Sequence, residues 1–99
     1  MILRERIRLE VRVGTTWTDR GQVRAGVSPM GSDVNRPTPE AVVTRYRFVL
    51  HRSADIAVGT AGARFTWRGL AYTAEGIVET HTIGGRIHHY EAVARAVSY

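Results

Sequence analysis

Apolar and polar residues alternate along most of this chain, which is the pattern of β-strands buried on one face. In residues 5–13, charged residues alternate with an apolar set made of Ile7, Leu9, Val11 and Val13. A second run places Val23, Ala25 and Val27 on one face. Between the two runs, Gly14 to Gly21 is rich in turn-forming residues, and we expect it to be a turn. We expect Pro29 and Gly31 to end the second strand.

The longest predicted strand covers Ala41 to Arg52. One face carries Val42, Thr44, Tyr46, Phe48 and Leu50. The other face mixes aliphatic and basic side chains, namely Val43, Arg45, Arg47, Val49 and His51. This second face is too polar for a core and too apolar for a fully hydrated surface. We therefore expect it to lie at a sheet edge or to contact a partner.

A β-hairpin is predicted over Ala63 to Val78, with a very short turn at residues 67–70. Gly69 supplies the positive φ that such a turn needs. The large side chains lie two apart on each side of the turn, so each pair shares one face and should be buried: Phe65, Trp67, Leu70 and Tyr72. We expect the second strand to continue to Thr80, with a bulge at Gly76.

The C-terminal part predicts another hairpin, with its turn at Gly84-Gly85 and a last strand from Ile87 to Val97. The whole pattern indicates about six strands and no helix. The predicted fold is therefore all-β, a small barrel or curled antiparallel sandwich forming a single domain over residues 1–99. One long loop, Met30 to Pro39, follows the second strand and is rich in Pro, Gly and polar residues.

Composition narrows the function classes. The chain has no cysteine, which excludes disulfides and thiolate metal sites. No apolar run approaches the length that spans a bilayer as a helix, and the charged N-terminal residues do not predict a signal peptide. The formal net charge is +5, and all 14 basic residues are arginine. Arginine suits both protein interfaces and phosphate contacts, so charge alone does not choose between them.

The candidate chemical groups do not predict catalysis, a cofactor or a metal site. His88 and His89 are adjacent and should point to opposite faces of a strand, unless the strand is kinked. His81 lies across the predicted hairpin and could approach one of them, but zinc would still lack clear third and fourth ligands. Glu75 and Glu79 resemble a carboxylate pair, yet we expect them to be solvated and to face arginines.

Basic and aromatic residues interleave in Arg45-Tyr46-Arg47 and in residues 64–68. On an open sheet such aromatics could stack nucleic-acid bases while the arginines contact phosphates. Period two instead favours aromatic rings in the core and arginines outside. The two readings differ in whether the rings are exposed on one strand face.

Several segments in this order resemble the head–tail joining (head-closure, or stopper) proteins of long-tailed phages. Those proteins carry a Trp in the first loop, as Trp17 does, followed by a strand and loop entry similar to residues 23–32. Tyr46 to Leu50 resembles their long strand, and Phe65 to Tyr72 looks like their Gly-turn hairpin. The resemblance covers nearly the whole chain and implies a small β-barrel.

The resemblance implies a structural protein of the virion, made in the host cytoplasm, that forms a homo-oligomeric ring and closes the DNA exit channel. Its implied partners are a portal or adaptor protein on the head side, a tail terminator or tail tube on the tail side, and passing double-stranded DNA, with no membrane. The implied channel or gate segment is Gly31, Ser32, Asp33, Val34, Asn35 and Arg36 within the loop 31–39. The expected interface residues are Trp17, Arg45, Arg47, Val49 and His51. A tail-terminator-like neck protein and a small oligonucleotide-binding β-barrel are the alternatives.

Overall fold

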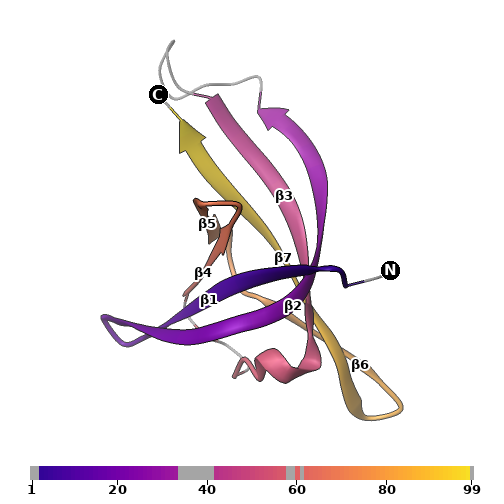
Figure 1. Ribbon diagram of the computed structural model, residues 1–99. Coiled ribbons are helices and arrows are strands. Elements are labelled where there is room, and N and C mark those ends of the chain that lie inside the picture. The colour runs from indigo at the N-terminus through magenta and orange to yellow at the C-terminus, as the bar shows by residue number, and fades with distance from the viewer. Residues whose placement is uncertain (1–2, 34–41, 58–59, 61, 99) are drawn as a thin grey trace.

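The computed structural model describes residues 3–33, 42–57, 60 and 62–98, and they form an almost entirely β structure (Figure 1). The described residues contain seven strands and one short 3-10 helix, η1, at Arg52–Ala54. The strands are β1 Glu5–Val13, β2 Thr16–Asp33, β3 Val42–His51, β4 Gly62–Trp67, β5 Leu70–Ala74, β6 Glu79–Ile83 and β7 Arg86–Ser98.

The strands form one antiparallel sheet that closes on itself as a barrel. The strand order is β3-β2-β1-β4-β5-β7-β6, and β7 also pairs with β3 over residues 42–51. Six strands therefore complete the barrel, and β6 is an extra strand attached to β7. Closure removes the free edges that a flat sheet of this size would leave. The prediction of a small all-β barrel is confirmed, with one strand more than expected.

The core lies inside the barrel and is formed by the apolar side chains on the inward face of each strand. The largest fully buried side chains are Ile7, Leu9, Phe48, Leu50, Phe65 and Tyr90. The predicted burial of Val11, Phe48, Phe65 and Tyr72 is confirmed, whereas Val27 and Trp67 are half-buried. The predicted burial of Leu70 is wrong. Its side chain is 43% exposed because it lies directly after the hairpin turn, at the end of the apolar row.

An aromatic cluster occupies one part of this core. Phe48 packs on Phe65 with ring centroids 4.7 Å apart, and Tyr46 meets Trp67 edge to face at 5.1 Å. Tyr72 contacts both Phe48 and Tyr46. The rings come from β3, β4 and β5, so the cluster fastens the β4–β5 hairpin to the opposite wall of the barrel.

Two turn predictions in the first half of the chain are wrong. Gly14 and Thr15 make the turn, but β2 already begins at Thr16 and includes the rest of the predicted turn. The turn-like residues there form a bulge opposite Leu9, where Gly21 takes a φ of +77°. Pro29 does not end the strand either, because the pairing with β3 resumes at Ser32 after an irregular stretch.

Two further expectations fail because of backbone geometry. The strand does not continue from β5 through Gly76: it stops at Ala74, the chain bends at Gly76 with a φ of +77°, and β6 starts at Glu79. Nor is β3 a sheet edge, since it pairs with β2 on one side and β7 on the other. The mixed face of β3 is therefore an outer face of the barrel wall.

Candidate functional site on the outer face of β3 and β7

A groove of about 530 Å³ is hollowed into the outer face of β3 and β7. It is lined by Leu3, Arg47, Val49, His51, Arg52, His88, His89 and Glu91. Three of the five predicted interface residues, Arg47, Val49 and His51, are thus brought together by the period-two repeat of β3. We call this surface the β3–β7 groove.

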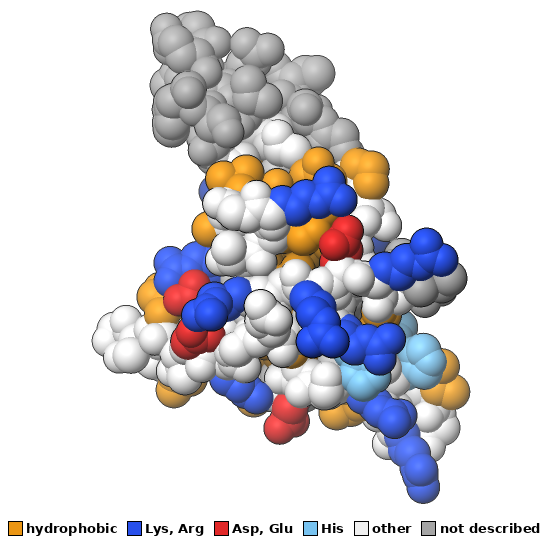
Figure 2. All heavy atoms as spheres, viewed as in Figure 1, with side chains coloured by type: hydrophobic (Ala, Val, Ile, Leu, Met, Phe, Trp, Pro, Cys, Tyr) orange, Lys and Arg blue, Asp and Glu red, His pale blue; other side chains and the backbone are white. Residues whose placement is uncertain are grey.

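The β3–β7 groove is basic around a single acidic side chain, Glu91. Arg47 Nη1 donates to Glu91 Oε1 at 2.9 Å across the β3–β7 pairing. Arg52 at the start of η1 adds an exposed guanidinium. On the face shown in Figure 2, histidine side chains lie among arginine side chains near the β6–β7 hairpin. Such a wall of aliphatic, imidazole and guanidinium groups suits contact with an acidic protein surface.

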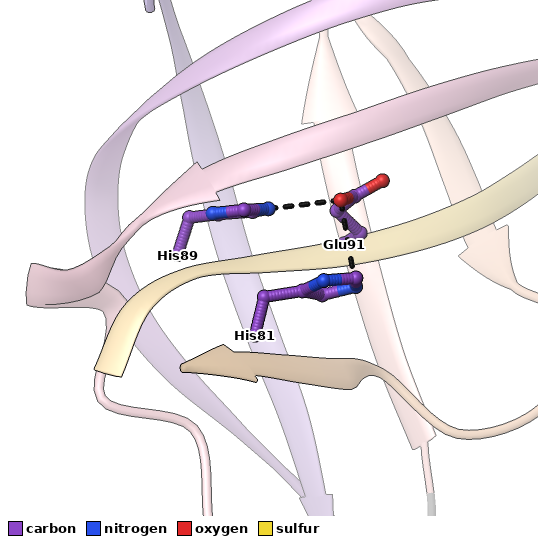
Figure 3. Close-up of side chains that lie close together, drawn as sticks. All are labelled: His81, His89 and Glu91. Carbon is purple, nitrogen blue, oxygen red and sulfur yellow. Dashed lines mark hydrogen bonds and ion pairs between the residues drawn. The ribbon is translucent and has the colours of Figure 1, made fainter. Parts of the chain in front are cut away.

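His89 and Glu91 of the groove lining form a cluster with His81 (Figure 3). The rings of His81 and His89 stack with centroids 4.7 Å apart and an interplanar angle of 13°. Nε2 of His89 lies 2.8 Å from Glu91 Oε2, and Nε2 of His81 lies 3.4 Å from the same oxygen. Both imidazoles therefore present Nε2 to one carboxylate oxygen.

The register of the β6–β7 hairpin creates this cluster. Ile83 pairs with Arg86 and Thr82 with Ile87, so a regular ladder would place His81 opposite His88. A bulge between Thr82 and His81 inserts one residue on β7, and His81 pairs with His89 instead. The expectation that His81 approaches one of the adjacent histidines is confirmed.

His88 and His89 do not diverge as adjacent residues of a regular strand would. Their Nδ1 atoms lie 2.8 Å apart and form a hydrogen bond, with the rings nearly perpendicular. The bulge opposite Thr82 and His81 kinks β7 here, so the side chains of His88 and His89 do not point to opposite faces as they would on a regular strand. The third group, Glu91, was missed at the sequence level, although the spacing His89-Tyr90-Glu91 places both side chains on one strand face.

Glu91 is held as a carboxylate by its neighbours. The hydrogen bond from His89 lowers the pKa of Glu91 below its ordinary value of 4.5, and the hydrogen bond from Arg47 acts in the same direction. Partial burial opposes this by raising the pKa, but the net direction is downward. The cluster thus combines two imidazoles with one ionised carboxylate at neutral pH.

The other two predicted interface residues lie outside the groove lining. Arg45 pairs with Glu75 at 2.7 Å, which confirms that Glu75 faces an arginine. Glu79 instead contacts His81 Nε2 at 2.9 Å. Trp17 is half-buried on β2 and carries the Arg64 guanidinium 4.3 Å above its ring.

That Arg64 guanidinium also forms a forked pair with Glu10, whose distances are 3.1 and 3.0 Å. Both Trp17 and Arg45 are therefore engaged in contacts within the chain.

The described half of the predicted gate segment is strand and not loop. Gly31, Ser32 and Asp33 belong to the last part of β2, and Ser32 and Asp33 pair with Thr44 and Val43. They end β2 at the end of the molecule away from the β6–β7 hairpin (Figure 1). Val34, Asn35 and Arg36 lie outside the described residues.

The described aromatic residues do not form a stacking platform. Phe48, Phe65, Tyr72 and Tyr90 are buried, and Tyr46, Trp17 and Trp67 are half-buried. The exposed large hydrophobic side chains in the described part are all aliphatic or Met. The period-two reading, with aromatic rings inward and arginines outward, is confirmed.

Comparison with known protein families, curated proteins and solved structures finds no match to this chain. Within the part of the chain that the structure describes, no helix is long and apolar enough to cross a membrane.

Proposed function

We propose that this chain is a structural component of a phage neck, in which copies form a ring that closes the DNA exit channel and offers a docking face to the tail. One observation carries the proposal: the mixed face of β3 is an outer wall of the barrel hollowed into the β3–β7 groove, and its aliphatic and guanidinium side chains suit protein contact. The resemblance of the sequence to head–tail joining proteins supports the phage neck as the assembly. Ring closure would use this face as one half of a head-to-tail contact between subunits.

The fold supports this assignment over its two alternatives. An oligonucleotide-binding barrel needs aromatic rings exposed along one strand face, and the described rings are buried or half-buried. A tail terminator usually carries helices beside its sheet, whereas the described residues contain only the three-residue η1. The net charge of +5 still predicts weak binding to DNA that lacks sequence preference and fades as salt rises.

Charge reversal in the groove tests the proposal. Arg52→Glu places a carboxylate where we expect an acidic partner surface, so the variant should fold but fail to enter particles of the phage that encodes it. The matched control is Arg24→Glu, because Arg24 is equally an exposed arginine but lies on β2 outside the groove lining. Quantitative mass spectrometry of purified particles measures incorporation. Equal incorporation of both variants would contradict the groove as a docking surface.

The gate assignment has its own test. Deleting residues 33–36 should leave the barrel folded, because among the described residues it removes only Asp33, the last paired residue of β2, and leaves the pairing of residues 25–32 with β3 in place. Particles carrying the deletion should leak packaged DNA before the tail joins. Normal DNA retention in particles that contain the deleted protein would show that this segment is not the gate.

A further inference from the structure

We propose that His81, His89 and Glu91 form a binding site for a divalent transition-metal ion, with Zn²⁺ as the ion that fits the donor set best. The three side chains lie side by side on the β6–β7 hairpin and converge on one point (Figure 3). The inference does not depend on the proposed neck function. It rests on the geometry, the chemistry of the donors and the groups that orient them.

The donor atoms are already spaced for one small ion. One ligand atom from each residue lies within 4.8 Å of the other two. In a tetrahedral zinc site with bonds of about 2.0–2.1 Å, the ligand atoms are about 3.3 Å apart. His81 Nε2 and Glu91 Oε2 are 3.4 Å apart, close to that spacing.

The second donor pair is tighter. His89 Nε2 and Glu91 Oε2 are 2.8 Å apart, which is a hydrogen bond, and an ion would replace it by opening the pair by about 0.5 Å. The two stacked rings keep both Nε2 atoms on the side that faces the carboxylate. An ion would also require the two stacked imidazole planes, which are only 13° from parallel, to tilt until both Nε2 lone pairs point at it.

Two neighbouring groups orient the ligands in the way that outer-shell residues of metal sites do. Arg47 occupies Glu91 Oε1 at 2.9 Å, which leaves Oε2 for the ion. His88 Nδ1 lies 2.8 Å from His89 Nδ1. When His89 Nε2 binds the ion, its Nδ1 carries the hydrogen and donates it to His88, which fixes the tautomer and the ring plane.

Charges near the site act in opposite directions. The Arg47 guanidinium repels a cation, whereas the Glu79 carboxylate, 2.9 Å from His81 Nε2, attracts one. Glu79 is mostly exposed, so it can turn away when His81 binds the ion. The Glu91 carboxylate supplies the negative charge that remains in direct contact.

The donor set selects the class of ion. Two imidazole nitrogens and one carboxylate suit Zn²⁺ and its transition-metal neighbours, whereas Mg²⁺ and Ca²⁺ prefer oxygen ligands. Three protein ligands leave a fourth position for water or for a donor atom of a bound partner. Bound zinc would also tie β6 to β7, the strand with which β6 pairs in the described sheet.

The test measures zinc binding to the untagged full chain by isothermal titration calorimetry in a buffer that does not chelate metals. The wild type should bind one Zn²⁺ per chain and show no binding of Mg²⁺ at the same concentrations. His81→Gln, His89→Gln and Glu91→Gln should each weaken binding by at least about tenfold, the loss seen when even an outer-shell partner of a metal is removed.

The matched control is His51→Gln. It removes one histidine from the neighbouring surface, but His51 accepts a hydrogen bond from the Ser53 amide and does not belong to the cluster. Its zinc affinity should equal that of the wild type. Circular dichroism checks that each variant is folded, and His81 lies on the strand outside the closed barrel, where substitution leaves the core intact.

A second readout uses thermal melting. A ligand that binds only the folded state raises the melting temperature, so zinc should stabilise the wild type and His51→Gln but not the three ligand variants. The proposal is overturned if the folded wild type binds no zinc. It is also overturned if the ligand variants bind like the wild type, or if His51→Gln loses as much affinity as they do.

Discussion

The β4–β5 and β6–β7 hairpins have the same kind of turn but different roles. In each, both central residues have positive φ: 51° and 77° at Arg68 and Gly69, and 59° and 77° at Gly84 and Gly85. This is the geometry of a type I′ turn, whose twist matches that of paired strands. The β4–β5 hairpin is bordered by β1 and β7, whereas β6 is held by β7 alone within the described sheet.

The two hairpins differ in the part next to the turn, because β7 joins the barrel wall only from His89 onward. Phe65 and Tyr72 on β4 and β5 are buried in the aromatic cluster. The β6–β7 hairpin instead exposes Ile83 and Ile87 and carries the histidine cluster. Turn chemistry therefore makes a hairpin, but the side chains that its strands bury decide whether it stabilises the barrel or presents a site.

The largest loss of stability is expected for a substitution in the β4–β5 hairpin, whose large side chains are buried. Phe65→Ala removes a fully buried ring whose centroid lies 4.7 Å from that of Phe48, and it should lower the free energy of unfolding by about 3–5 kcal/mol. Denaturant unfolding measures the change. A loss below about 1 kcal/mol would mean that the β4–β5 hairpin does not anchor the core.

Replacing the turn glycines tests whether each hairpin unfolds together with the whole barrel or opens locally. Gly69→Ala and Gly85→Ala each force an alanine into a φ of +77°, at a local cost of about 1–2 kcal/mol. For Gly69 the full cost should appear in global unfolding, because both flanking strands are part of the closed barrel. For Gly85 it should appear mainly as faster amide exchange in β6, which can detach locally. Equal global losses would show that β6 is integral to the cooperative unit.

A smaller effect concerns acid stability. The pKa of Glu91 lies below its ordinary value of 4.5, so its stabilising contribution is complete above that pH and is lost as the pH falls through the lower folded-state pKa. Glu91→Gln should therefore flatten the acid limb of the stability profile below pH 4.5. Unfolding titrations at several pH values measure this. An unchanged acid limb would mean that His89 and Arg47 do not stabilise the carboxylate in solution.

The smallest effect is expected at the exposed tip. Ile83 is 66% exposed beside the Gly84-Gly85 turn, so Ile83→Ala should change the free energy of unfolding by less than about 0.5 kcal/mol. Run beside Phe65→Ala in the same denaturant series, it sets the lower end of the comparison. A loss comparable to that of Phe65→Ala would mean that this tip is buried in solution.

The alternation of the sequence was enough to predict most of the fold. The apolar phases of β1, β3 and β4 and both glycine turns follow from local spacing, and closure follows from the need to cover edges. The errors lie where tertiary pairing overrides local signals. Gly21 and Pro29 read as turn residues, yet each is accommodated within the 18 residues of β2, where the pairing becomes irregular.

The candidate site was only partly predictable. The groove residues Arg47, Val49 and His51 follow from the face pattern of one strand. The partnership of His81 with His89 does not, because it depends on a one-residue bulge that no local signal near Thr82 indicates. Glu91 could have been predicted from the sequence, because it lies two residues after His89 on the same strand face.

Electron microscopy of particles assembled without this chain tests the central claim most directly. Under the proposed neck function, disruption of its gene should give phage heads that package DNA, fail to retain it and carry no tails. Expression of the wild-type chain from a plasmid should restore tailed particles filled with DNA. Normal tailed, filled particles from the disrupted phage would contradict the assignment to the phage neck.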